Sequence, residues 1–260
     1  MPELPEVETF KNFFNRTFIN RKVISLSLPE TSMLEDTSRA DIIKSLAGYR
    51  FTNTFRHGKY FFAQNEKGYE LIIHYGMTGR LEFNAGNDLV KYSRLALEFS
   101  HGFLHFVCIR KLGRISITCN KDAYIKQKGL GPDALSLSKK VFLQMVDGKK
   151  GMVKPALMDQ SFIAGLGNIY VDELCFKCGI KPCKKLGHMR KNELSLLYEC
   201  MQDVLHASIK ASAEISRMPA GWLIKRRKEG ALCPRCGFKI SRVKLQGRGT
   251  YYCGGCQSMD

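Results

Sequence analysis

Long apolar runs are missing from this sequence. No stretch approaches the ~18 apolar residues that a membrane-spanning helix needs, and no basic helix suited to lying on a membrane stands out. The N-terminus is acidic where a secretory signal peptide would be basic, so nothing there directs export. Internal repeats and low-complexity tracts are also missing. These absences predict a cytoplasmic globular protein with no membrane partner.

Acidic residues are scarce relative to basic ones. The chain has 24 Asp and Glu against 41 Lys and Arg, which gives a formal net charge of +17. A charge of this size favours a polyanionic partner, most simply nucleic acid. With 260 residues and 44% hydrophobic content, the chain can also bury a sizeable core, and its length favours two domains.

The cysteines are present in number but are not expected to form disulfides, because an unexported protein keeps its thiols reduced. Two CxxC pairs, at 233–236 and 253–256, have the spacing of a structural zinc site. We therefore predict one Zn²⁺ that does no chemistry and holds a β-hairpin. Its ligands are Cys233, Cys236, Cys253 and Cys256.

A second group, Cys175, Cys178, Cys183 and His188, has spacing that also fits a metal. The alternative is a helix end with buried thiols, and we favour that alternative.

The hydrophobic pattern divides the chain. A helix is expected over residues 3–17, and short alternating segments then continue to about residue 120 with a helix near 39–47, which is typical of an antiparallel sandwich or barrel. The sequence GLGPD at 129–133 is the expected hinge. Helical spacing follows over 139–146, 155–159, 168–178 and 192–215.

The first residues carry a pattern with two interpretations. If Met1 is removed, Pro2 becomes a secondary amine that titrates near pH ~8 and can attack an aldehyde-like carbon to give an iminium. Glu3 lies beside it and can move protons. The other interpretation is an ordinary helix start, because Pro and acidic residues suit a first turn. Both interpretations can hold together.

A second motif, GLGNIY at 165–170, places glycines and an Asn cap at a helix start, which suits a phosphate. An ordinary helix-turn-helix packing element explains it equally well.

The sequences PELPEVE at 2–8, GLGNIY at 165–170 and QGRGTYYC at 246–253 together resemble the formamidopyrimidine-DNA glycosylase and endonuclease VIII family. The resemblance implies an α+β fold: an N-terminal antiparallel β-sandwich with flanking helices (1–131), a helical domain with a helix-two-turn-helix motif (132–220) and a zinc-ribbon hairpin (221–260). It also implies a bifunctional glycosylase and abasic-site lyase. The expected partner is double-stranded DNA with damaged bases or abasic sites, bound by a monomer in the nucleoid.

The resemblance also assigns roles to residues that match the family's motifs. Pro2 would attack C1′ of the damaged nucleotide, and Glu3 would assist ring opening and proton transfer. Lys59 would contact phosphates beside the lesion, and Arg248, Lys154 and Asn168 would form a clamp on the phosphates of the bent duplex. The hole left by the flipped base would be filled by Met77, Arg110 and Leu112.

The sequence departs from the family pattern in two places. Leu112 stands where formamidopyrimidine-type enzymes usually have an aromatic residue, and 216–228 is shorter than the loop that covers oxidised guanine in many of them. We predict activity on oxidised purines, namely 8-oxoguanine and formamidopyrimidine. The alternatives are a pyrimidine-directed, endonuclease VIII-like enzyme, a non-catalytic damage-binding protein, and a zinc-ribbon module of translation or transcription.

Overall fold

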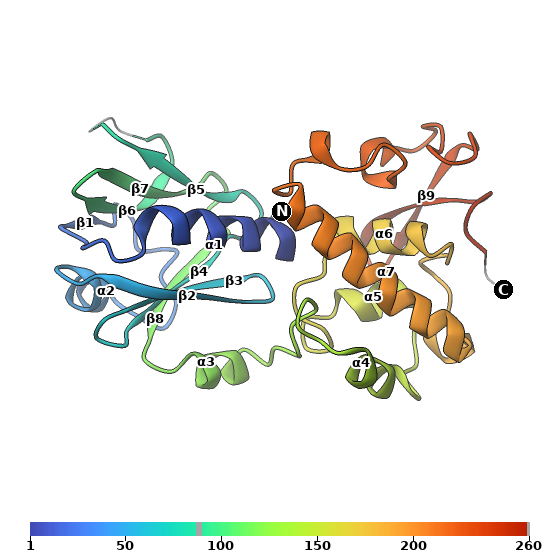
Figure 1. Cartoon of the computed structure of the whole chain (residues 1–260), viewed down its shortest axis with the longest axis horizontal. Helices are drawn as coiled ribbons and strands as arrows, with labels where there is room; N and C mark the ends of the chain where they lie inside the picture. The colour runs from blue at the N-terminus through green and yellow to red at the C-terminus, as the bar shows by residue number, and fades with distance from the viewer. Residues whose placement is uncertain (87–89, 259–260) are drawn as a thin grey trace. The chain divides into compact units, whose positions relative to one another are not determined.

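The computed structural model describes residues 1–86 and 90–258, which fold as α+β (Figure 1). The chain divides into two compact units, Met1–Lys128 and Gly129–Asp260. The division into three domains, 1–131, 132–220 and 221–260, remains a prediction. Within the described ranges, no helix is both long and apolar enough to cross a membrane.

The N-terminal unit is a sandwich of two four-stranded antiparallel sheets, with strand orders β1-β6-β7-β5 and β2-β3-β4-β8. Its strands are β1 (Leu26–Ser27), β2 (Phe51–His57), β3 (Tyr60–Asn65), β4 (Glu70–His74), β5 (Gly79–Asn84), β6 (Ser93–Phe99), β7 (Gly102–Cys108) and β8 (Arg114–Thr118). Its helices are α1 (Leu4–Phe18), α2 (Arg39–Leu46) and α3 (Lys121–Gln127).

Helix α1 runs along the sandwich between the two sheets (Figure 1). Val7, Phe14 and Phe18 recur at helical spacing and are 0% exposed, because this face closes the core of the sandwich. Phe14 meets Phe51 edge to face, with ring centroids 5.1 Å apart. The predicted helix is confirmed, and packing fixes the position of its first turn.

The elements of this unit differ from the prediction in three places. The apolar alternation that begins at Val23 predicts a strand there, but regular strand structure covers only Leu26–Ser27. Strand β5 was not expected, although its residues alternate between buried and more exposed positions. Helix α3 was also missed, because Tyr124 is its only buried residue and its other positions give no apolar stripe.

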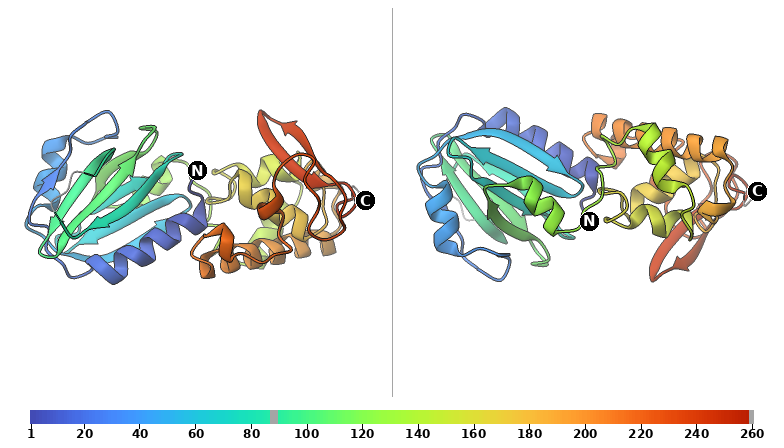
Figure 2. Two further views of the ribbon diagram at one scale, coloured as in Figure 1. Left: turned by 90° about the horizontal axis from the view of Figure 1, so that it is seen from above. Right: turned by 90° about the horizontal axis from the view of Figure 1, so that it is seen from below.

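The C-terminal unit contains helices and one hairpin. Its helices are α4 (Lys139–Val146), α5 (Val153–Met158), α6 (Asn168–Lys177) and α7 (Lys191–Lys210), with short 3₁₀ turns η1 (Leu186–His188), η2 (Ile215–Arg217) and η3 (Leu223–Arg226). Strands β9 (Ile240–Leu245) and β10 (Arg248–Cys253) pair antiparallel. Figure 2 shows this hairpin, in red, standing out from the helices of its unit.

Two helix ends differ from the predictions. Helix α7 ends at Lys210 and not at Ile215, because Ser212 and Ala213 adopt left-handed φ values of 54° and 57° that no glycine announced. It begins one residue earlier than expected, with Arg190 as its N-cap. For α6 the N-cap is Gly167, so Asn168 is the first helical residue and not the cap.

Candidate functional site

The predicted catalytic pair lies at the start of α1. Glu3 is the N-cap, is 1% exposed, and its backbone N–H donates to Glu6 Oε2 at 2.9 Å. Pro2 lies just outside the helix and is half-buried, while Met1 is 46% exposed. Since Met1 is present, the Pro2 nitrogen is an amide in this structure. The exposed Met1 leaves the bond that must be cut within reach of an aminopeptidase.

The turn that carries Lys59 is anchored to the same helix. Arg56 Nε donates to Glu8 Oε2 of α1 at 2.7 Å, and Arg56 Nη1 donates to the Gly58 carbonyl at 3.0 Å. Arg56 is 7% exposed, so this pairing takes place largely out of water. Arg56 therefore fixes the β2–β3 turn relative to the helix that begins with the Pro2-Glu3 pair.

The Lys59 ammonium also acts on its surroundings. Burial, followed by the nearby positive charge of Lys59, lowers the pKa of His74 to about 4. His74 ends β4 and pairs with Tyr60, the residue after Lys59. His74 is therefore neutral at physiological pH, and it adds no second positive charge beside Lys59.

The three residues expected to fill the hole left by the flipped base lie on two loops, and these loops are in contact. Met77 and Leu112 are 42% and 44% exposed, and Arg110 is exposed. The Arg110 N–H donates to Thr78 Oγ1 at 3.2 Å. Gly76 has φ +61°, and a Cβ there would lie 2.4 Å from the backbone of Leu112. The structure thus brings Met77, Arg110 and Leu112 together on one exposed ridge.

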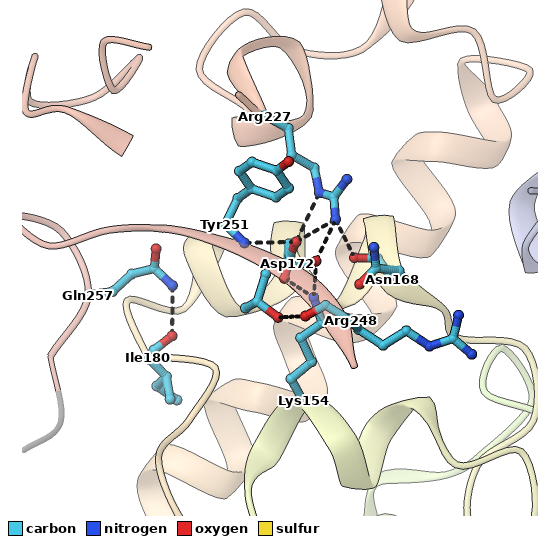
Figure 3. Close-up of polar contacts among 10 residues, drawn as sticks. Lys154, Asn168, Asp172, Ile180, Arg227, Arg248, Tyr251 and Gln257 are labelled. Carbon is cyan, nitrogen blue, oxygen red and sulfur yellow. Dashed lines mark hydrogen bonds and ion pairs between the residues drawn. The ribbon is translucent and has the colours of Figure 1, made fainter. Parts of the chain in front are cut away.

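The predicted phosphate clamp lies in the C-terminal unit, around the turn of hairpin β9–β10. Arg248 begins β10, is exposed, and its side chain extends away from Asp172 (Figure 3). Lys154 and Arg248 both line a cavity of about 500 Å³, to which Lys149 and Lys150 add further positive charge. A pocket lined by several cations suits an anionic group.

Lys154 is buried, with 1% exposure, and its ammonium lies 2.6 Å from Asp172 Oδ1 (Figure 3). Burial lowers the pKa of Lys154 and raises the pKa of Asp172, while their mutual attraction opposes both shifts. Asn168 begins α6, and its Oδ1 is buried with no hydrogen-bond partner among the described residues. Asp172 pairs with both Lys154 and Arg227, and Arg227 donates to the backbone carbonyls of Asn168 and of Gly249, the residue after Arg248, so the three predicted residues lie in one neighbourhood.

The four cysteines of the predicted zinc site converge. Their Sγ atoms all lie within 4.8 Å of one another, with 3.7 Å between Cys233 and Cys256 and 3.5 Å between Cys236 and Cys253. Tetrahedral Zn–S bonds of about 2.3 Å place sulfur atoms just under 4 Å apart, so the arrangement fits Zn²⁺. With sulfur at all four positions, the metal would hold the hairpin and leave no site for substrate.

The second cysteine group does not converge in this way. Over residues 1–86 and 90–258, the Cys233 set is the only cluster of His, Cys, Asp or Glu with metal-binding geometry. Cys175 is 0% exposed, and the Cys178 thiol donates to the Cys175 carbonyl at 3.6 Å. These thiols pack at the end of α6.

The segment 216–228 is hydrogen-bonded to helix α6. Glu173 accepts the backbone N–H groups of Leu223 and Ile224 at 3.2 and 2.7 Å. Burial raises the pKa of Glu173 to about 7, against the opposing effect of these hydrogen bonds. The segment is therefore held on α6 at Leu223 and Ile224, within the turn η3.

Sequence reasoning missed Arg56, Asp172 and Arg227, which hold the predicted residues in place. No sequence signal pairs them with their partners, because Arg56 lies far along the chain from Glu8, and Arg227 from Asp172. Arg227 also belongs to the basic run 225–228, which is more typical of a solvated surface.

A basic two-unit fold with a zinc-ribbon hairpin defines a nucleic-acid-binding protein. Family models match the formamidopyrimidine-DNA glycosylase N-terminal domain over residues 1–115, its H2TH domain over 130–220, and the zinc finger found in FPG and IleRS over 230–258. The formamidopyrimidine-DNA glycosylase of Pelotomaculum thermopropionicum is 32% identical over 276 residues, with 100% of both chains covered.

Solved structures agree. A Lactococcus lactis enzyme of this name in complex with FAPY-dG DNA is 29% identical, with a TM-score of 0.89 over 98% of this chain and 100% of the other. The same protein bound to abasic-site DNA is 28% identical, with a TM-score of 0.88 over 98% and 99%. The chain belongs to the formamidopyrimidine-DNA glycosylase family.

Proposed function

We propose that this chain removes oxidised purines from duplex DNA through a covalent intermediate on Pro2, and then cleaves the strand at the resulting abasic site. Membership of the family supports the general activity: the chain is a DNA glycosylase of base-excision repair, and lyase activity is part of the family. We place it in the cytoplasm, on nucleoid DNA, acting as a monomer.

The observation that carries the proposed mechanism is the placement of Pro2 beside the buried Glu3 at the capped start of α1. Once Met1 is removed, the Pro2 nitrogen forms a bond to C1′ as the bond from C1′ to the damaged base breaks. Glu3 passes a proton to the ring oxygen as the C1′–O bond opens, and the nitrogen loses its own proton to give the iminium. The iminium makes the C2′ hydrogen acidic, so that its loss as a proton to a base expels the 3′ phosphate as the C3′–O bond breaks. We assign to Lys59 the role of disfavouring the protonated form of the amine, since a positive charge close to an amine lowers its pKa.

The remaining residues make the base accessible. Extruding a nucleotide costs a few kcal/mol, and we assign the offsetting phosphate contacts to Arg248, Lys154 and Asn168. The ridge of Met77, Arg110 and Leu112 would fill the vacated space, because an exposed flexible methionine suits insertion between bases.

Preference for purines is supported by relatives. A related MutM structure, 29% identical, holds DNA with carbocyclic 8-oxo-G, and the L. lactis relative holds FAPY-dG. The short segment 216–228 is the observation that favours the pyrimidine-directed alternative.

Borohydride trapping tests the proposal. Processed protein is incubated with duplexes that carry 8-oxoguanine, 5-hydroxyuracil or an abasic site, and the adduct is mapped by peptide mass. We expect an adduct at Pro2 with the abasic and 8-oxoguanine duplexes. Protein that retains Met1 is the matched control and should give none. Trapping of this control, or no trapping even on the abasic duplex, would overturn the mechanism. Stronger trapping on 5-hydroxyuracil would support the pyrimidine-directed alternative.

A further inference from the structure

A cluster of three charges, two of them buried and one partly buried, lies beside the turn of hairpin β9–β10. The Asp172 carboxylate is 0% exposed and is shared by two cations: Lys154 at 2.6 Å on Oδ1 and Arg227 at 2.8 Å on Oδ2. The Tyr251 N–H also donates to Oδ2, at 3.2 Å (Figure 3). Desolvating three charges is costly, and such clusters often stabilise a fold less than apolar side chains would. Specific positioning is the better explanation for this one.

Lys154 and Arg227 share a second acceptor, the backbone carbonyl of Gly249. Lys154 Nζ donates to this oxygen at 3.3 Å, and Arg227 Nη2 donates to it at 3.4 Å. Gly249 directly follows Arg248 in β10. The buried Lys154 and the partly buried Arg227 therefore fix the backbone immediately beyond the exposed Arg248 side chain.

The Arg227 guanidinium reaches the other predicted DNA contact as well. Nη2 donates to the Asn168 carbonyl at 3.2 Å, at the first residue of α6. The guanidinium also lies over the Tyr251 ring, 4.6 Å from its centroid. A planar group with several donors can make all of these contacts at once, whereas a lysine ammonium on a flexible stem cannot.

We propose that Arg227 is a positioning residue for DNA binding: it sets the spacing between Arg248 on the hairpin and Asn168 on α6, so that both reach phosphates of one duplex. Arg227 acts through these two residues and does not contact DNA. This inference rests on the proposed phosphate roles of Arg248 and Asn168. Asp172 holds Arg227 in place, and the stack on Tyr251 orients it.

A double-mutant cycle tests the inference. Affinity for an abasic-site duplex is measured over a salt series for the processed wild-type protein, Arg227→Lys, the pair Arg248→Ala/Asn168→Ala, and the combination of all three. We expect Arg227→Lys to weaken binding about tenfold with an unchanged salt slope, because the charge is kept and the spacing is lost. In the Arg248→Ala/Asn168→Ala background, Arg227→Lys should cost less than about twofold.

Arg226→Lys is the matched control: it makes the same change at the exposed neighbouring residue, and we expect it to bind as the wild type does. Tyr251→Leu removes the stack without changing a charge and should give a smaller loss with the same dependence on background, whereas Tyr251→Phe should bind normally. Zinc content and thermal unfolding identify variants that fail to fold, and Tyr251→Leu decides the question if Arg227→Lys is one of them.

The outcomes are distinguishable. If Arg248→Ala/Asn168→Ala binds as tightly as the wild type, the proposed clamp is wrong and the inference falls with it. If that pair weakens binding and Arg227→Lys weakens it equally in both backgrounds, the clamp stands and the positioning role is overturned. A loss that depends on background supports the role.

Discussion

The two units hold their predicted site residues by different means. In the N-terminal unit, apolar packing of α1 against the sandwich places Pro2 and Glu3, with Phe14 and Phe18 fully buried, and a single ion pair, Arg56–Glu8, holds the turn that carries Lys59. In the C-terminal unit, the residues around Arg248 are held by buried charges and by a metal site. Apolar packing is insensitive to pH and to chelators, whereas ion pairs respond to pH and a thiolate metal site responds to both. The two units of this protein should therefore unfold under different conditions.

Removal of zinc should have the largest effect. Structural Zn²⁺ contributes on the order of 10 kcal/mol to the folding of small zinc domains, so chelation should unfold hairpin β9–β10 and abolish DNA binding. The sandwich should stay folded. Hydrogen exchange before and after chelation can follow the amides of β10 and α1 separately.

Cys236→Ser should reproduce the effect of the chelator, while Cys119→Ser, at an exposed cysteine outside the site, should not. Protected β10 amides in protein shown to be free of zinc would contradict the prediction.

Phe14→Ala should destabilise the N-terminal unit and leave the C-terminal unit folded. A fully buried phenylalanine truncated to alanine costs about 3 to 5 kcal/mol of unfolding free energy, and the loss should appear in the N-terminal unit only. Denaturant unfolding separates the two units, because tryptophan fluorescence reports only the C-terminal unit, which contains Trp222, the single tryptophan of the chain. Phe55→Ala is the control, because Phe55 is 39% exposed and should cost much less. Equal losses for the two variants would show that packing does not dominate here.

Acid should act on the C-terminal unit through Glu193. The hydrogen bond from Lys184 lowers the pKa of Glu193 from 4.5 to about 2. A carboxyl whose pKa is lowered by folding stabilises the protein above its unfolded pKa and loses that contribution as the pH falls through the folded pKa.

We therefore expect the wild type to lose about 1 kcal/mol more stability than Glu193→Gln between pH 4.5 and 2, since the pair is partly solvated. Thermal unfolding across this range measures the difference, and parallel curves for the two proteins would rule out the effect.

Local pattern predicts local structure well in this chain. The stripe at Val7 and Phe14 located α1, and the apolar spacing over 139–146 gave the bounds of α4. The paired CxxC motifs located the zinc site because metal geometry constrains the spacing of its ligands. Helix α3 and the end of α7 were missed, because one is nearly all polar and the other ends in left-handed residues that are not glycine.

The supporting residues could not be predicted. Glu8 and Arg56, and likewise Asp172 and Arg227, become neighbours only after folding, and an isolated Asp or Arg is most often a solvated surface residue. Sequence reasoning therefore identified the residues expected to contact DNA but not the charged residues that position them.

The close approach of Gly76 to Leu112 has a consequence for how enzymes of this design can diversify. A side chain at position 76 would collide with backbone atoms that no rotamer change can move, so the contact point between the two loops has almost no freedom to mutate. Met77 and Leu112 lie on either side of it and face solvent, where exchange of one side chain for another costs the fold little. Evolution can thus vary the two side chains that we propose enter the DNA while the glycine contact between the loops stays the same, and a laboratory library at positions 77 and 112 could do likewise.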